Sequence, residues 1–211
     1  MQCAQHRAGV SPLRFRAVLF DLDGVLVESF EAWHRLVDAV ARDLGHPSVA
    51  LEAYTAGWGQ SVEADALQYC PGDPPEEIER RFVARFREFS AWLRVDPEAA
   101  PLLEALRGLG LRTAVVTNTP EPLARETVAG AGLAPDLVVG TGRLAAKPAP
   151  DMPLHACATL GVRPKEALFV GDTRFDLEAA RAAGIPFAGL GIEGDHSLAR
   201  LRDLLPLVSP R

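Results

Sequence analysis

The sequence predicts an α/β protein with a doubly wound parallel sheet, interrupted by an inserted all-helical domain. Two observations favour this fold class. Short apolar runs, of the length of buried strands, alternate with segments of helical periodicity along most of the chain. Between residues 28 and 96 the alternation stops and only helical patterns are found. We therefore expect an α/β core formed by residues 1–27 and 97–211, and a helical cap formed by residues 28–96.

The first strand is expected at Ala17–Phe20, an apolar run that stops at the turn sequence Asp-Leu-Asp-Gly. The cap should begin with an amphipathic helix closed by Gly45, with apolar residues at Phe30, Trp33, Val37, Val40 and Leu44. A second cap helix follows Pro74-Pro75 and repeats the pattern at Ile78, Phe82, Phe86, Phe89 and Leu93. This periodicity places the aromatic residues in the core of the cap.

Beyond Asp96-Pro97 the alternation resumes. A short helix should end at Gly108 or Gly110, and the strand Thr113–Val116 should follow it. The later elements are a helix from about Pro120 to Ala131, a strand at Leu137–Val139, a helix from about Pro150 to Leu160, a strand at Ala167–Val170, a helix at Phe175–Ala183 and a strand at Phe187–Leu190. Strands that alternate with helices at this spacing form a parallel sheet, because each parallel connection needs a crossover.

Composition excludes several classes of protein. A formal net charge of -6 and a pI near 5.4 argue against nucleic acid as a partner, because a surface that follows phosphates needs an excess of basic residues. No apolar run approaches the length of about 18 residues needed to span a membrane. The segment Met1–Phe15 lacks the apolar stretch of a secretory signal. The three scattered cysteines form neither a disulfide framework nor a zinc motif, so we expect a reducing, cytoplasmic location.

Polar residues follow each of the first four predicted strands of the core. Ligands of open parallel sheets bind beyond the carboxyl ends of the strands. The residues at these positions are Asp21 and Asp23, Thr117 and Asn118, Lys147 in the loop after the third strand, and Asp172 and Asp176. Each has a plainer interpretation when taken alone: Asp176 could equally cap a helix, and Thr117-Asn118 could form a turn. Their combination at four strand ends favours a functional site.

The residue types at this predicted site point to phosphoryl transfer. Up to four carboxylates would meet there, and they repel one another unless a cation or a proton intervenes. Oxygen ligands without His or Cys favour a hard ion, for which Mg²⁺ is the usual choice. Lys147 then remains to meet an anionic ligand, beside the hydroxyl of Thr117. A metal, a nucleophilic carboxylate, a cation and a hydroxyl are the groups that phosphoryl transfer employs.

Four segments resemble, in order, the four motifs of the haloacid dehalogenase superfamily. They are Asp21–Ser29 (Asp-Leu-Asp-Gly-Val-Leu-Val-Glu-Ser), Val115–Thr119, Lys147–Asp151 and Gly171–Asp176. The resemblance extends from about Ala17 to Leu190, and the inserted cap resembles that of the subgroup containing phosphoglycolate phosphatases. It implies a Rossmann-like catalytic core, a cap that selects the substrate, and a Mg²⁺-dependent phosphatase acting on a small phosphorylated metabolite.

The resemblance also implies roles for individual residues. Asp21 would attack phosphorus and form an aspartyl-phosphate, and Asp23 would act first as an acid and then as a base. Thr117 would bind a phosphoryl oxygen with the help of the Asn118 amide, and Lys147 would neutralise both the nucleophile and the transferred group. The implied ligands of Mg²⁺ are Asp21, the backbone carbonyl of Asp23, Asp172 and, directly or through another group, Asp176.

Several departures narrow the activity that the resemblance implies. Relatives that attack carbon generally lack the second acid of the first motif, whereas Asp23 is present here. Phosphonate-cleaving relatives use a cap lysine, but the only lysines of this chain are Lys147 and Lys165, both outside the cap. Two alternatives stay open. One is a β-phosphoglucomutase-type transferase, although Gly171-Asp172-Thr173 lacks the acidic pair common there. The other is a non-catalytic binding module, which would fail to trap a beryllium fluoride mimic of the aspartyl-phosphate.

Substrate choice should depend on the cap. The segment Gly57–Ser61 contains two glycines that could bring backbone close to a ligand, and Trp58 could cover that ligand or could equally belong to the cap core. The cap contains 7 arginines against 13 acidic residues, so it accounts for the whole net charge of -6. An acidic cap does not by itself attract anionic substrates. We therefore expect a local arginine or a backbone nest, which the sequence does not identify.

Overall fold

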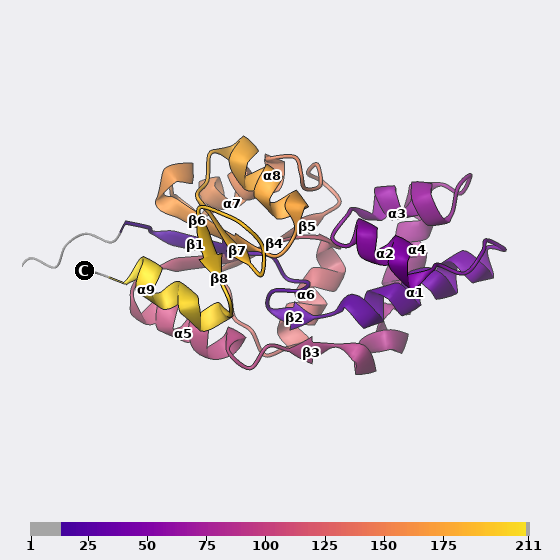
Figure 1. Cartoon of the computed structure of the whole chain (residues 1–211), viewed down its shortest axis with the longest axis horizontal. Coiled ribbons are helices and arrows are strands. Elements are labelled where there is room, and N and C mark those ends of the chain that lie inside the picture. The colour runs from indigo at the N-terminus through magenta and orange to yellow at the C-terminus, as the bar shows by residue number, and fades with distance from the viewer. Residues whose placement is uncertain (1–13, 210–211) are drawn as a thin grey trace, which may run out of the picture.

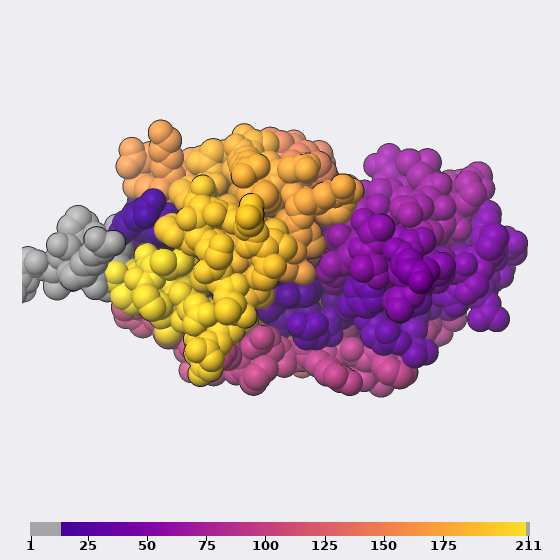
Figure 2. Space-filling view, in the orientation of Figure 1, coloured from indigo at the N-terminus to yellow at the C-terminus, as the bar shows by residue number. Residues whose placement is uncertain are grey.

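The computed structural model describes residues 14–209 and shows two lobes (Figure 1). One lobe contains the parallel sheet and both ends of the described chain. The other consists of helices from residues 30–92 and forms the opposite end of the molecule, as the space-filling view also shows (Figure 2). The prediction for the start of the chain falls almost entirely outside the described residues. No helix within residues 14–209 has the length and apolar character needed to cross a bilayer.

Six parallel strands form the sheet in the order β5-β4-β1-β6-β7-β8. Their bounds are β1 Ala17–Phe20, β4 Arg112–Pro120, β5 Leu137–Thr141, β6 Ala167–Gly171, β7 Phe187–Leu190 and β8 His196–Leu198. The central strand β1 is buried throughout, as its uninterrupted apolar sequence predicts for a strand covered on both faces. The predicted doubly wound parallel sheet is thus confirmed, and β8 extends it beyond the last strand that the sequence indicated.

Alternate residues of β1 belong to two separate hydrophobic cores, because successive side chains of a strand point to opposite faces. Val18 and Phe20 pack with α5 (Ala99–Gly108), α6 (Glu121–Gly130) and α9 (Leu205–Val208). Ala17 and Leu19 pack with α7 (Asp151–Leu160) and α8 (Arg174–Ala183). The short 3₁₀ helices η2 (Pro164–Glu166) and η3 (Leu201–Leu204) complete this lobe.

The helical lobe has a hydrophobic core of its own, which includes Trp33, Tyr54 and Phe82. Its elements are α1 (Phe30–Asp43), α2 (Leu51–Gly57), α3 (Val62–Tyr69), α4 (Pro75–Arg85) and the 3₁₀ helix η1 (Phe86–Trp92). These helices lie within residues 28–96, where the cap is expected; the division into two domains and the role of the cap in substrate selection stay predictions.

Two details of the helical lobe differ from the prediction. The helix expected to run through Leu93 changes at Phe86 from α4 into η1. The 3₁₀ form aligns residues three apart on one face, which keeps both Phe86 and Phe89 against the core, and it rises faster per residue toward the exit of the lobe. In addition, β2 (Val27–Glu28) and β3 (Arg94–Val95) pair in antiparallel fashion where the chain enters and leaves the lobe. Two-residue strands are too short to leave a pattern in the sequence.

Candidate active site

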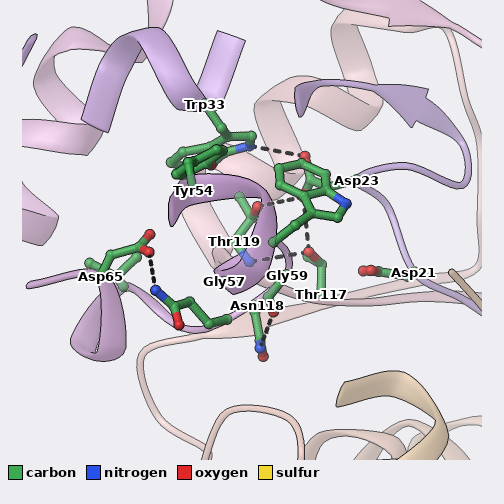
Figure 3. A pocket seen from close by; sticks show the side chains of 13 residues that line it. Asp21, Asp23, Trp33, Tyr54, Gly57, Gly59, Asp65, Thr117, Asn118 and Thr119 are labelled. Atoms are coloured by element: carbon green, nitrogen blue, oxygen red, sulfur yellow. Dashed lines mark hydrogen bonds between the residues drawn. The ribbon is translucent and has the colours of Figure 1, made fainter. Parts of the chain in front are cut away.

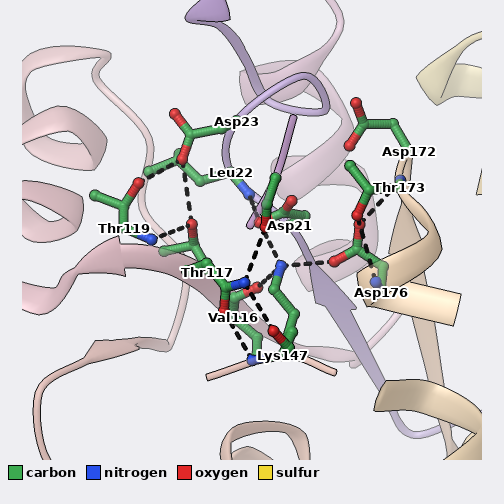
Figure 4. Close-up of polar contacts among 12 residues, drawn as sticks. Asp21, Leu22, Asp23, Val116, Thr117, Thr119, Lys147, Asp172, Thr173 and Asp176 are labelled. Atoms are coloured by element: carbon green, nitrogen blue, oxygen red, sulfur yellow. Dashed lines mark hydrogen bonds and ion pairs between the residues drawn. The ribbon is translucent and has the colours of Figure 1, made fainter. Parts of the chain in front are cut away.

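Side chains from the ends of β1, β4 and β6 meet in one crevice between the two lobes (Figure 4). The three strands are neighbours in the sheet and run in the same direction, so their carboxyl ends lie at the same edge. Asp21 directly follows β1, Thr117 and Asn118 lie near the end of β4, and Asp172 directly follows β6. The predicted convergence at the strand ends is therefore present in the structure.

Lys147 is the buried cation at the bottom of this crevice. Its Nζ lies 2.8 Å from Asp21 Oδ1 and 2.6 Å from Asp176 Oδ1, and it donates a third hydrogen bond of 3.1 Å to the carbonyl of Val116. Burial by itself lowers the pKa of Lys147, but the carboxylates of Asp176 and Asp21 more than offset this and raise it above its ordinary value. The amine is therefore a fixed positive charge.

One carboxylate oxygen of Asp21 is held by protein contacts and the other is free. Oδ1 accepts a 2.7 Å hydrogen bond from the Leu22 amide as well as the contact with Lys147. Oδ2 has no partner among the described residues, and Asp21 lines the cavity below the helical lobe. Burial, followed by the negative charge of Asp176, raises the pKa of Asp21 well above its ordinary value. The free oxygen is placed as a nucleophile would be, and the raised pKa calls for a further positive charge nearby.

The chemistry of the donor set fits a hard divalent ion. Carboxylate oxygens of Asp21, Asp172 and Asp176 lie within 4.8 Å of one another. Asp172 Oδ1 is buried and has no hydrogen-bond partner, which is costly unless a cation meets it. Burial and then Asp176 raise the pKa of Asp172 to about 7, as expected for acids crowded without a counterion. Gly24, with φ of 79°, permits this crowding, because a Cβ there would lie 2.2 Å from Asp172 Oδ2.

Asp176 is both a helix cap and a member of the site. At the start of α8 it forms a capping box with Thr173, whose backbone N–H (3.1 Å) and hydroxyl (2.6 Å) donate to Asp176 Oδ2. Its Oδ1 faces Lys147. The two interpretations that the sequence left open for this residue thus apply together. Both of its oxygens already accept hydrogen bonds, which suits a supporting position beside Asp21 and Asp172.

The side chain of Asp23 points away from the acidic group and toward the helical lobe. Its Oδ1 accepts from Ser29 Oγ (2.5 Å) and Trp33 Nε1 (3.0 Å). Its Oδ2 accepts from Thr119 Oγ1 (2.6 Å) and Thr117 Oγ1 (3.2 Å). Four donors around one carboxylate hold it in place. Ser29, Trp33 and Thr119 were not predicted as site residues. Trp33 was predicted only as part of the cap core; it does pack in that core, and its indole N–H also reaches the site.

Asn118 joins three parts of the site. Its Nδ2 donates to the carbonyls of Gly59 (2.9 Å) and Lys147 (3.0 Å), and its Oδ1 accepts a 2.8 Å hydrogen bond from the Lys147 amide. The side-chain amide is therefore occupied with positioning Lys147 and the segment between α2 and α3, which leaves the predicted contact with substrate to other atoms of the residue.

A small cavity of about 40 Å³ lies between the sheet edge and the helical lobe (Figure 3). The residues that line it are Asp21, Asp23, Trp33, Tyr54, Gly57, Trp58, Gly59, Gln60, Val62, Asp65, Thr117, Asn118 and Thr119. Trp58, predicted as a substrate contact, lies in this wall, and its Nε1 is 3.4 Å from Asp172 Oδ2. Tyr54, Gln60 and Asp65 were not predicted as site residues, because nothing local in the sequence shows which way they face.

Comparison with known proteins decides the family. The model of the haloacid dehalogenase-like hydrolases matches residues 15–184. The chain belongs to this family. A phosphoglycolate phosphatase of Nitrosospira multiformis is 34% identical over 185 residues, which cover 82% of each chain. An N-acetylmuramic acid 6-phosphate phosphatase of Pseudomonas aeruginosa is 31% identical, over 84% of this chain and 82% of the relative.

Solved structures of the family agree with this assignment. CbbY of Rhodobacter sphaeroides, solved in complex with phosphate, has a TM-score of 0.78 at 26% identity, and the match covers 92% of this chain and 99% of CbbY. The predicted superfamily, its Rossmann-like fold and a phosphatase activity are thereby confirmed. The substrates named for these proteins are properties of the relatives.

Proposed function

We propose that this haloacid dehalogenase-like hydrolase is a Mg²⁺-dependent phosphatase that acts on small phosphomonoesters through an aspartyl-phosphate on Asp21. The observation that supports this most strongly is the arrangement around Asp21. One of its oxygens is held by Lys147 and the Leu22 amide, while the other is free at the cavity. A carboxylate positioned in this way is prepared for attack, because little reorganisation is needed before the reaction.

In the first step, the free oxygen of Asp21 forms a bond to phosphorus while the bond from phosphorus to the leaving oxygen breaks. Asp23, entering this step protonated, gives its proton to the leaving oxygen, and an alcohol departs. In the second step, water attacks phosphorus, the bond to Asp21 breaks and Asp23 takes the proton from the water. The four hydrogen bonds that Asp23 accepts hold its carboxyl group in place for both roles.

Lys147 and Thr117 stabilise the phosphoryl group during its transfer. The cation of Lys147 lowers the repulsion between an incoming phosphate dianion and the carboxylates of Asp21 and Asp176. The hydroxyl of Thr117 donates to Asp23 in this structure, and rotation about its side chain would direct it to a phosphoryl oxygen. Asp21 and Asp172 would hold Mg²⁺, with Asp176 in support. The resemblance to the family adds the backbone carbonyl of Asp23 as a further ligand. The bound ion would supply positive charge against the developing negative charge on the phosphoryl oxygens.

The proposed setting is the cytoplasm, with a small phosphorylated metabolite as substrate. Two observations support it: Cys70 and Cys157 are free, buried thiols, and the cavity is too small for a macromolecular ligand. The names of the relatives make 2-phosphoglycolate the reference substrate for assays.

The proposal is tested by measuring phosphate release from 2-phosphoglycolate and other small phosphomonoesters. We expect release with Mg²⁺ and none with excess chelator. Asp21→Asn keeps the shape of the side chain but removes the nucleophile, so its rate should fall by roughly 10³-fold or more. Glu104→Gln, which removes an exposed charge from α5, should behave as wild type. Full activity of Asp21→Asn, or activity in excess chelator, would contradict the proposal.

A further inference from the structure

The helical lobe presents no cationic side chain to the cavity. Among the thirteen described residues that line it there is no Lys, Arg or His. Lys147 lies below Asp21, with its three hydrogens directed to Asp21, Asp176 and a backbone carbonyl. His34, on α1, stacks on Tyr54, but its Nε2 donates to the carbonyl of Val49 at 2.9 Å. The local arginine expected for an anionic leaving group is therefore not among the lining residues.

The cavity instead contains a carboxylate from the helical lobe. Asp65, on α3, is only 8% exposed and lines the cavity (Figure 3). One of its oxygens, Oδ1, accepts a 2.8 Å hydrogen bond from Gln60 Nε2. The other oxygen has no hydrogen-bond partner within residues 14–209. This oxygen is therefore available to accept a hydrogen bond from a donor on a molecule bound in the cavity.

The other lining groups of the lobe are aromatic or neutral. Trp33 and Trp58 have their N–H groups directed to Asp23 and Asp172, so they offer the cavity mainly their rings. The hydroxyl of Tyr54 has no hydrogen bond within the described residues, and it is a second polar group at the same wall as Asp65. The carboxylate of Asp65 thus sits among apolar ring surfaces, where the field of a charge is weakly screened.

These contacts determine which end groups the cavity accepts. A carboxylate on the leaving group would meet Asp65 with no cation between them, and the two charges would repel across a medium of low dielectric constant. A hydroxyl or an ammonium would instead donate a hydrogen bond to the free oxygen of Asp65. The net charge of the cap, 13 acidic residues against 7 arginines, acts in the same direction.

We infer that Asp65 selects phosphomonoesters whose leaving group ends in a hydrogen-bond donor, a hydroxyl or an ammonium, and that it disfavours leaving groups that end in a carboxylate. The inference rests on the proposed phosphatase function and deepens it. It separates this chain from its relatives named phosphoglycolate phosphatase, whose named substrate bears a carboxylate. Asp65 is in this view a specificity-determining residue.

Three two-carbon phosphomonoesters test the inference, because they differ mainly in the end group: 2-hydroxyethyl phosphate, phosphoethanolamine and 2-phosphoglycolate. At pH 8, where Asp65 is charged, we expect kcat/KM with Mg²⁺ to be about tenfold or more higher for at least one of the first two than for 2-phosphoglycolate. Phosphate release from none of the three would overturn the proposed function and the inference together. Release that is fastest from 2-phosphoglycolate would overturn the inference alone.

The variant Asp65→Asn tests whether Asp65 causes the preference for leaving groups that end in a hydrogen-bond donor. The amide oxygen of Asn still accepts a hydrogen bond, so hydrolysis of 2-hydroxyethyl phosphate should be retained. Hydrolysis of phosphoethanolamine should fall, and that of 2-phosphoglycolate should rise by about tenfold. Glu63→Gln removes an exposed charge from the same helix and should change none of these values. A damaged fold would lower kcat/KM for all three substrates alike and leave their ratios unchanged. An unchanged ratio of kcat/KM for phosphoethanolamine to that for 2-phosphoglycolate would therefore overturn the role of Asp65.

Discussion

At the scale of single residues, several side chains of the site perform two tasks. Asp176 caps α8 and also fixes Lys147, while Trp33 fills the core of the helical lobe and also holds Asp23. Patterns in the sequence predicted one task for Trp33, because helical periodicity reports burial but not the direction of a side-chain N–H group. For Asp176, capping and membership of the site were foreseen as alternatives, but its contact with Lys147 was not.

Lys147 should be needed for stability as well as for activity. Lys147→Met would leave Asp21 and Asp176 buried without their cation, and we expect it to lower the free energy of unfolding by about 3–5 kcal/mol at neutral pH. Denaturant unfolding in the presence of chelator measures this loss, and phosphate release should disappear. Lys165→Met is the matched control, because Lys165 is exposed and has no ion pair among the described contacts. Equal unfolding midpoints for the two variants would rule out this role for Lys147.

At the scale of elements, the parallel sheet explains why residues distant in the sequence meet. Strands β4, β1 and β6 are adjacent, so Thr117, Asp21 and Asp172 reach the same edge. This could be predicted because alternating strands and helices leave few topologies for a parallel sheet. The break between α4 and η1 and the short strand β8 could not, since both depend on contacts with other elements rather than on local periodicity.

The segment between α2 and α3 contacts the sheet lobe across the crevice, and we expect activity to fall when Gly59 in this segment gains a side chain. This residue has φ of 87°, and a Cβ would lie 2.7 Å from Thr173 Cγ2 across the crevice. Gly59→Ala should therefore reduce kcat/KM, by about tenfold, as well as cost about 1 kcal/mol of stability.

Gly45→Ala separates these two effects. Gly45 has nearly the same φ, 85°, but nothing lies within 4 Å of the added Cβ. Gly45→Ala should therefore show the loss of stability, measured by thermal unfolding, while its kcat/KM stays that of wild type. If Gly59→Ala keeps full activity, the contact between the lobes does not matter for catalysis.

At the scale of the whole molecule, burial of Asp65 links stability to pH. Burial raises the pKa of Asp65 to about 7, and the Gln60 hydrogen bond lowers it only in part. The titratable groups around it are Tyr54 on α2, Tyr69 on its own helix, Cys70 directly after that helix and Asp23 in the core. Because the folded-state pKa lies above the unfolded value, the stabilising contribution of protonated Asp65 is lost as pH rises through about 7.

Asp65→Asn should remove this pH dependence. The variant should unfold at a higher temperature than wild type at pH 8, by roughly 3–8 °C, and the difference should shrink toward pH 5, where wild-type Asp65 is protonated. Thermal unfolding at a series of pH values, with chelator present, measures the effect. Glu63→Gln again serves as the control and should follow wild type throughout. A difference that is constant with pH would show that Asp65 does not titrate in this range.

The sequence by itself determined the parallel sheet, the position of the inserted helices and the residues at the strand ends. Hydrophobic periodicity and turn chemistry are local, so they can be read along the chain. Only the tertiary structure decided that Asn118 holds Lys147 and Gly59, that Asp23 faces the helical lobe, and that Asp65 rather than an arginine enters the cavity. These outcomes depend on how α1, α2 and α3 pack over the sheet edge, and the direction of a helical side chain is set by that packing rather than by its neighbours in sequence.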